Sequence, residues 1–174
     1  MDAQQAVKPL TSQNFSKNQP LQVLMVCMGN ICRSPTAEWV LRHKLQAAGM
    51  ADWVQVASAG THNYHPGNPA DARSARHAAR RGYDLSLHRA RQLVPSDFEQ
   101  NHWLFTMDWD NQALTEEMCP PAHRHKVQML MSLVHPNPCV AVPDPYYGGD
   151  AGFEAVLDMA EAASDALIAR LQAR

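Results

Sequence analysis

The stretch VLMVCMGNICRSPTAE, residues 23–38, carries most of the information about the fold of this chain. An apolar run, Leu21–Val26, leads into a polar loop, and Ser34 and Pro35 follow the loop. The run has the composition of a buried parallel strand. Ser at an N-cap with Pro in the first helical position is typical of a helix start. A loop between such a strand and helix presents backbone N–H groups to an anion, so the sequence predicts a phosphate-binding loop.

The loop has the form C-x5-R-S, with Cys27 at its start and Arg33 and Ser34 at its end. The planar guanidinium of Arg33 can bind two phosphate oxygens at once. A thiol among N–H dipoles and beside a guanidinium is expected to ionise and act as a nucleophile, with Ser34 hydrogen-bonded to it. The plain alternative is a buried structural thiol and a surface arginine. The strand before, the glycine within and the helix start after the loop favour the functional interpretation.

Cleavage of a phosphate ester also needs a proton donor for the leaving oxygen. The only acidic residue before Cys27 is Asp2, near the N-terminus, so the acid is expected downstream. The best candidate is Asp144, in the segment VPDPYYGG at residues 142–149, where two prolines stiffen the backbone and two tyrosines follow. Taken alone, Asp-Pro is an ordinary turn signal.

Beyond the loop, apolar and amphipathic segments alternate along the chain. Strands are predicted at Trp53–Ala57, His102–Met107 and Val127–Met131, and helices at about 34–49, at about 69–81, from Asp108 to the prolines at 120–121, and at Ala151–Leu171. This order predicts an α/β fold, a four-stranded parallel sheet with helices on both faces and the phosphate-binding loop after the first strand. Ligands of such folds bind at the carboxyl ends of the strands.

Composition narrows the class of protein. The 174 residues are 45% hydrophobic and 18% charged, which predicts one globular domain over residues 20–174 after a flexible extension at residues 1–19. The net charge of −2 argues against nucleic-acid binding and attraction to anionic membranes. No apolar run is long enough for membrane insertion, and the N-terminus lacks a secretory signal, so a cytoplasmic protein is expected.

The spacing of the cysteines and histidines does not match a metal-binding motif. None of the four cysteines, Cys27, Cys32, Cys119 and Cys139, has CxxC spacing with another. The pair His123 and His125 near Cys119 fits no standard zinc site. We therefore expect no metal and no other cofactor. Surface positions are predicted for the remaining polar candidates: His62, His65, His77 and the helical series Arg73, Arg76, Arg80 and Arg81.

With these pieces in view, residues 21–174 resemble the low-molecular-weight protein tyrosine phosphatase family. The resemblance is carried by the motifs VCMGNICRSPTAE, SAGT, DLSLHRAR, MD followed by Asn111, and DPYYGG, in this order. It implies Cys27 as nucleophile, Arg33 as phosphate ligand and Asp144 as general acid and base. The substrate-binding residues that it implies are Met28, Gly29, Asn30, Ile31, Cys32, Ser34, Tyr64, Tyr146 and Tyr147, with Ser58 and His88 in support.

The resemblance implies hydrolysis of phosphotyrosine in proteins through a phosphocysteine intermediate at Cys27. It also implies protein substrates that include tyrosine kinases, and a monomer or weak dimer. Two alternatives stay open: arsenate reduction on the same fold, which relays a disulfide through further cysteines, and a non-catalytic phosphate-binding signalling module. Cys32 is either a packed side chain or the partner of an oxidised Cys27 in a protective disulfide. Tyr64 stands where the family often has Trp.

Overall fold

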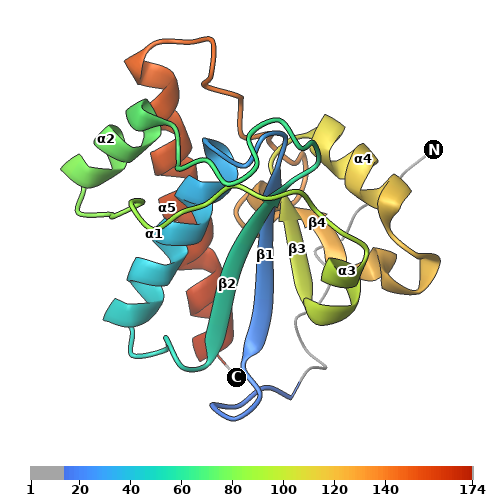
Figure 1. The fold of residues 1–174 in the computed structure, drawn as a ribbon. Coiled ribbons are helices and arrows are strands. Elements are labelled where there is room, and N and C mark those ends of the chain that lie inside the picture. The colour runs from blue at the N-terminus through green and yellow to red at the C-terminus, as the bar shows by residue number, and fades with distance from the viewer. Residues whose placement is uncertain (1–13, 174) are drawn as a thin grey trace.

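The strands of the computed structural model, which describes residues 14–173, form a single parallel sheet (Figure 1). They are β1 (Leu21–Cys27), β2 (Val54–Gly60), β3 (Trp103–Thr106) and β4 (Val127–Met129), in the order β2-β1-β3-β4. Because β1 pairs with both β2 and β3, it lies in the interior of the sheet, and six of its seven residues are buried. The apolar run in the sequence had predicted this position.

Helices cover both faces of the sheet, as predicted (Figure 1). On one face α1 (Arg33–Ala47) packs against β1, β2 and α5 (Asp150–Gln172), and α2 (Ala72–Arg80) packs on α5. On the other face lie α3 (Ser96–Gln100) and α4 (Trp109–Met118). The side chains of β1 alternate between the two apolar cores that result.

Several element bounds differ from those expected. The fourth strand ends at Met129, not Met131, because the 3-10 helix η2 (Leu130–Leu133) takes over its last residues. The short α3 and the 3-10 helix η1 (Pro121–Lys126) were not predicted. Helix α2 begins at Ala72, three residues later than expected, where the Asp71 carboxylate caps it by accepting from two backbone N–H groups.

The predicted N-cap at Ser34 is wrong. Helix α1 begins at Arg33 with Cys32 in the N-cap position, and no side chain caps it. The Ser34 hydroxyl instead lies 2.8 Å from the Asn30 amide nitrogen and 2.9 Å from the Cys27 sulfur. The first turn of α1 is therefore left open to an anion, and Ser34 faces the loop.

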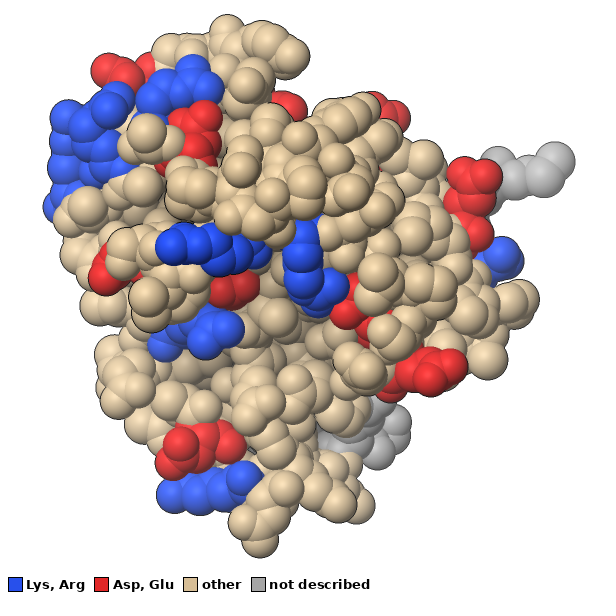
Figure 2. All heavy atoms as spheres, in the orientation of Figure 1, with Lys and Arg blue, Asp and Glu red and all other residues tan. Residues whose placement is uncertain are grey.

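Two side chains that were expected on a solvated surface, one in α2 and one just after it, instead bind to α5. His77 is 2% exposed, with its ring nitrogens against carboxylates of α5. Arg81, just after the helix, pairs with three carboxylates of α5: Glu154, Asp158 and Glu161. Figure 2 shows basic and acidic side chains next to one another over this part of the molecule, at the upper left. The surface there is a mixture of both signs.

The expected extension, residues 1–19, falls mainly on residues 1–13, which lie outside the described part of the chain. In the described part, Ser16 and Gln19 close a turn through two backbone hydrogen bonds. Phe15 packs edge-on against Trp53, with the ring centroids 6.5 Å apart. Among residues 14–173, no helix has the length and apolar character that a membrane span requires.

Candidate active site

The phosphate-binding loop joins the carboxyl end of β1 to the start of α1. The chain reverses at Asn30, whose φ of 57° lies in the left-handed region that Asn tolerates better than most residues. The end of β2 approaches so closely that a Cβ at Gly60 would lie 2.6 Å from the Met28 carbonyl oxygen. Two backbone N–H groups after Gly60, those of Thr61 and His62, donate to the carbonyls of Cys27 and Met28. Only glycine fits at position 60, and it lets β2 fix the loop from behind.

Asn30 is the internal support of the loop. Its amide nitrogen donates to the Ser34 hydroxyl at 2.8 Å and to the Ser58 hydroxyl at 2.9 Å, and its side-chain oxygen accepts from the Arg91 N–H at 3.0 Å. The Nε2 of His88 donates to the Asn30 carbonyl at 2.7 Å. Burial lowers the pKa of His88 and so favours the neutral ring. These bonds hold a left-handed residue that would otherwise be costly.

The two thiols of the loop have different surroundings. The Cys27 sulfur lies 2.9 Å from the Ser34 hydroxyl and opens into the mouth of the loop. Burial, followed by the charge of Asp71, raises the pKa of Cys32 to about 12. Cys32 is therefore a neutral thiol at physiological pH. Cys27 stands at the end of β1 with its sulfur beside the Ser34 hydroxyl, as a nucleophile for phosphorus would.

Arg33 projects from the first turn of α1 and is 2% exposed. Its Nη1 lies 2.5 Å from the Asp108 carboxylate and donates to the Val142 carbonyl at 3.0 Å, while its Nη2 lies 3.7 Å from the Asp144 carboxylate. Burial alone would lower the pKa of this guanidinium, but negative charge at Cys27 and the Asp108 carboxylate raise it. Arg33 thus stays charged in the interior, ready for an anion.

A cavity of about 280 Å³ opens above the loop. Ten of its eleven lining residues had been predicted: Cys27, Met28, Gly29, Ile31, Cys32, Arg33, Tyr64, Asp144, Tyr146 and Tyr147. The Asp144 carboxylate lies at its rim, accepting from the Tyr146 N–H at 3.0 Å. Four supporting residues do not line the cavity: Asn30 and Ser34 within the loop, and Ser58 and His88, which bond to Asn30.

Aromatic rings form the upper wall of the cavity. Tyr64 is exposed and stacks on His62, with centroids 4.8 Å apart and an interplanar angle of 11°. Tyr146 meets Tyr147 edge-on, with the ring centroids 4.9 Å apart, and Tyr147 is 95% exposed. All three tyrosines line the cavity, so a flat aromatic group that enters it meets aromatic rings.

Sequence reasoning missed two residues of the site. His65 lines the cavity, and its ring lies so close to Gly29 that a Cβ there would be 3.2 Å from it. Asp108 was expected only at the start of a helix. Its carboxylate does cap α4 by accepting from the Asn111 N–H, and it also pairs with Arg33. Asp108 directly follows a predicted strand, and the carboxyl ends of the strands form the edge of the sheet where the loop lies. This position could have indicated that Asp108 belongs to the site.

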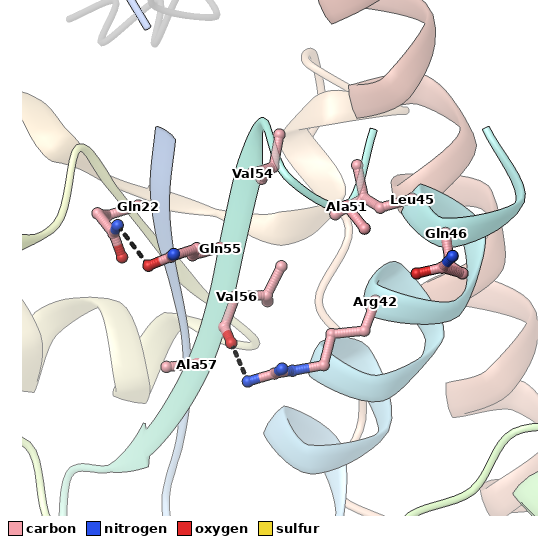
Figure 3. A pocket seen from close by; sticks show the side chains of 9 residues that line it. All are labelled: Gln22, Arg42, Leu45, Gln46, Ala51, Val54, Gln55, Val56 and Ala57. Atoms are coloured by element: carbon pink, nitrogen blue, oxygen red, sulfur yellow. Dashed lines mark hydrogen bonds between the residues drawn. The ribbon is translucent and has the colours of Figure 1, made fainter. Parts of the chain in front are cut away.

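A second hollow, of about 480 Å³, lies between α1 and β2 (Figure 3). It contains no cysteine or carboxylate, and its one charged side chain, Arg42, donates to the Val56 carbonyl. The larger hollow therefore lacks the groups for phosphate chemistry. Within residues 14–173, no three His, Cys, Asp or Glu side chains lie together as a metal site would require, and Cys119, His123 and His125 form no such group.

The chain was compared with known proteins. A family model described as "Low molecular weight phosphotyrosine protein phosphatase" matches residues 22–174. A "Low molecular weight protein-tyrosine-phosphatase" from Streptomyces coelicolor is 41% identical over 157 residues, covering 87% of this chain and 93% of that protein.

Two crystal structures share the fold. A protein tyrosine phosphatase from Entamoeba histolytica, with Hepes in its active site, superposes with a TM-score of 0.83 at 37% identity and covers 88% of this chain and 97% of its own. DARP, a Drosophila arginine phosphatase, superposes with a TM-score of 0.81 at 28% identity and covers 87% and 98%.

Proposed function

Since the chain belongs to the low-molecular-weight phosphotyrosine protein phosphatase family, we propose that it hydrolyses phosphotyrosine in proteins through a phosphocysteine intermediate at Cys27. The observation that carries the proposal is that two side chains of the phosphate-binding loop meet a third, from a distant segment, around one cavity. Cys27 supplies a nucleophile, Arg33 a buried cation and Asp144 a carboxyl group at the rim.

In the first step the Cys27 thiolate attacks phosphorus, forming an S–P bond as the P–O bond to the phenol breaks. The N–H groups of the loop and Arg33 hold the three remaining oxygens, whose charge the transition state spreads. Asp144, as the carboxylic acid, gives its proton to the leaving oxygen.

In the second step water attacks the phosphocysteine. The Asp144 carboxylate takes a proton from the water, the S–P bond breaks, and inorganic phosphate and the Cys27 thiolate are released. The Ser34 hydroxyl, 2.9 Å from the sulfur, stabilises this thiolate as it leaves. Asn30 holds the same hydroxyl in place at 2.8 Å.

The walls of the cavity favour an aromatic ester. Tyr64, Tyr146 and Tyr147 offer ring faces and edges to a phenyl ring. The partners are then phosphotyrosine proteins, among them tyrosine kinases whose action the enzyme reverses. One of the proteins that share the fold is an arginine phosphatase. Preference for phosphotyrosine is therefore best measured against phosphoarginine.

The two alternatives have less support. Arsenate reduction needs a relay of cysteines, but Cys119 lies in the core on the α3 and α4 side of the sheet, away from the face that contains Cys27. A binding module needs neither a nucleophilic thiol nor a carboxyl group above the phosphate site, and both are present here.

The test measures hydrolysis of p-nitrophenyl phosphate, phosphotyrosine peptides and phosphoarginine. We expect Cys27→Ser to be inactive, and Asp144→Ala to lose about 10²–10⁴-fold on phosphotyrosine but less on p-nitrophenyl phosphate, a better leaving group. Controls are Cys139→Ser and Asp52→Ala, which change the same residue types outside the cavity. Activity in Cys27→Ser would disprove the mechanism; faster turnover of phosphoarginine than of phosphotyrosine would disprove the substrate.

A further inference from the structure

Helix α2 contacts both the phosphate-binding loop and α5, the helix that follows the segment containing Asp144. At its start, the Asp71 backbone N–H donates to the carbonyl of Ile31 at 2.8 Å. Ile31 is in the middle of the phosphate-binding loop, between Cys27 and Arg33. The first turn of α2 is thus bonded directly to the part of the chain that holds the phosphate.

Farther along α2, His77 reaches the beginning of α5. Its Nδ1 lies 2.7 Å from the Glu154 carboxylate and its Nε2 lies 3.2 Å from the Asp150 carboxylate. The ring stacks on Phe153, with centroids 5.6 Å apart and an interplanar angle of 9°. Both ring nitrogens therefore face carboxylates of α5. The side chain is 2% exposed, and it holds the first turn of α5.

Arg73 makes a second link from α2. Its guanidinium lies over the ring of Tyr146 at 5.4 Å from the centroid, and over Phe153 at 4.8 Å. The Asp71 carboxylate lies 3.0 Å from the same guanidinium and fixes its position. One helix therefore contacts the phosphate-binding loop, a wall of the cavity and the start of α5.

These contacts matter because the hydrogen bonds that the segment with Asp144 forms to the rest of the described chain lie at its ends, and between them Arg73 touches the segment through Tyr146. At one end the Val142 N–H donates to the Met107 carbonyl at 2.7 Å, and the other end continues into α5 at Asp150. Asp144 itself is exposed, and its nearest cation, Arg33, is 3.7 Å away. The position of its carboxyl group over the cavity thus depends on where α5 begins.

We propose that His77 is a positioning residue for the general acid, because it ties the start of α5 to the helix that is bonded to the phosphate-binding loop. The inference rests on the proposed function of Asp144. His77 touches neither substrate nor reacting atoms; it acts through Asp150 and Glu154. A displacement of the acid by about 1 Å can cost up to about 100-fold in rate, so loss of this link should weaken proton donation.

The experiment compares kcat/KM for phenyl phosphate, a poor leaving group, with that for p-nitrophenyl phosphate. In His77→Gln we expect a loss of about 10-fold on phenyl phosphate and a loss of less than about threefold on p-nitrophenyl phosphate. Asp150→Ala removes the acceptor that faces the His77 Nε2 and should shift the ratio in the same direction. Because the Asp150 side chain is 82% exposed, this variant should fold.

The control is Lys44→Gln, which breaks an ion pair between α1 and α5 at Asp165 and involves neither carboxylate of the His77 link. Thermal unfolding of each variant shows how far it is destabilised. If His77→Gln and Asp150→Ala keep the wild-type ratio of the two substrates, or Lys44→Gln changes it equally, the positioning role is wrong. The proposed function fails by a different result, activity in Cys27→Ser.

Discussion

Arg33, which lines the cavity, forms a partly buried ion pair with Asp108, and removal of this pair gives a measurable prediction. Asp108 has two tasks: it neutralises Arg33 at 2.5 Å, and it caps α4 by accepting from the Asn111 N–H at 2.7 Å. Asn is as good an N-cap as Asp. Asp108→Asn therefore removes the charge and keeps the cap, whereas Asp108→Ala removes both.

The surroundings of the ion pair determine how much its removal changes the free energy of unfolding. Removing one partner of a fully buried ion pair costs about 3–5 kcal/mol. Here Asp108 is 24% exposed, and Arg33 keeps the Val142 carbonyl at 3.0 Å, so we expect the free energy of unfolding to fall by about 2–3 kcal/mol in Asp108→Asn. Asp108→Ala should lose about 1 kcal/mol more. For a domain of this size, Asp108→Asn should lower Tm by about 4–12 °C.

The assay is urea unfolding at pH 7, with and without inorganic phosphate. Phosphate should recover part of the loss, because the bound anion becomes the new partner of Arg33. Asp110→Asn is the control: Asp110 is an exposed carboxylate of the same turn and forms no ion pair within residues 14–173, so its effect should stay within about 0.5 kcal/mol. A loss in Asp108→Asn no larger than in this control would refute the reasoning.

Two further predictions concern pH and oxidation. Because burial lowers the folded-state pKa of His88, the unfolded chain binds more protons, and the free energy of unfolding should fall as pH drops below about 6.5. Urea unfolding across pH 5–8 should show a shallower fall in His88→Gln, and equal slopes would contradict this. After peroxide treatment, the Cys27 sulfenic acid and the Cys32 thiol should condense to a disulfide with release of water. A dithiol should then restore a larger fraction of activity in the wild-type protein than in Cys32→Ser. Equal recovery of activity would show that Cys32 does not protect Cys27.

How much the sequence predicted depended on how local each feature is. The loop at residues 27–34 was predictable because strand, loop and helix follow one another within a few residues. The link between Asp108 and Arg33 was not, since it joins segments 75 residues apart and depends on the order of the strands. The sequence predicted a surface position for His77, because polar character alone does not reveal that two carboxylates of α5 face this ring.

The two carboxylates beside Arg33 differ in a way that separates support from chemistry. Asp108 lies 2.5 Å from the guanidinium and caps α4, so moving it would leave the buried Arg33 charge without this partner. Asp144 lies 3.7 Å from the guanidinium, is 40% exposed and lines the cavity. Asp144 is therefore the carboxyl group that can meet a substrate and exchange a proton with it in the proposed reaction. Its segment leads into the start of α5, which His77 ties to α2, and in this way a residue outside the cavity bears on the proposed reaction.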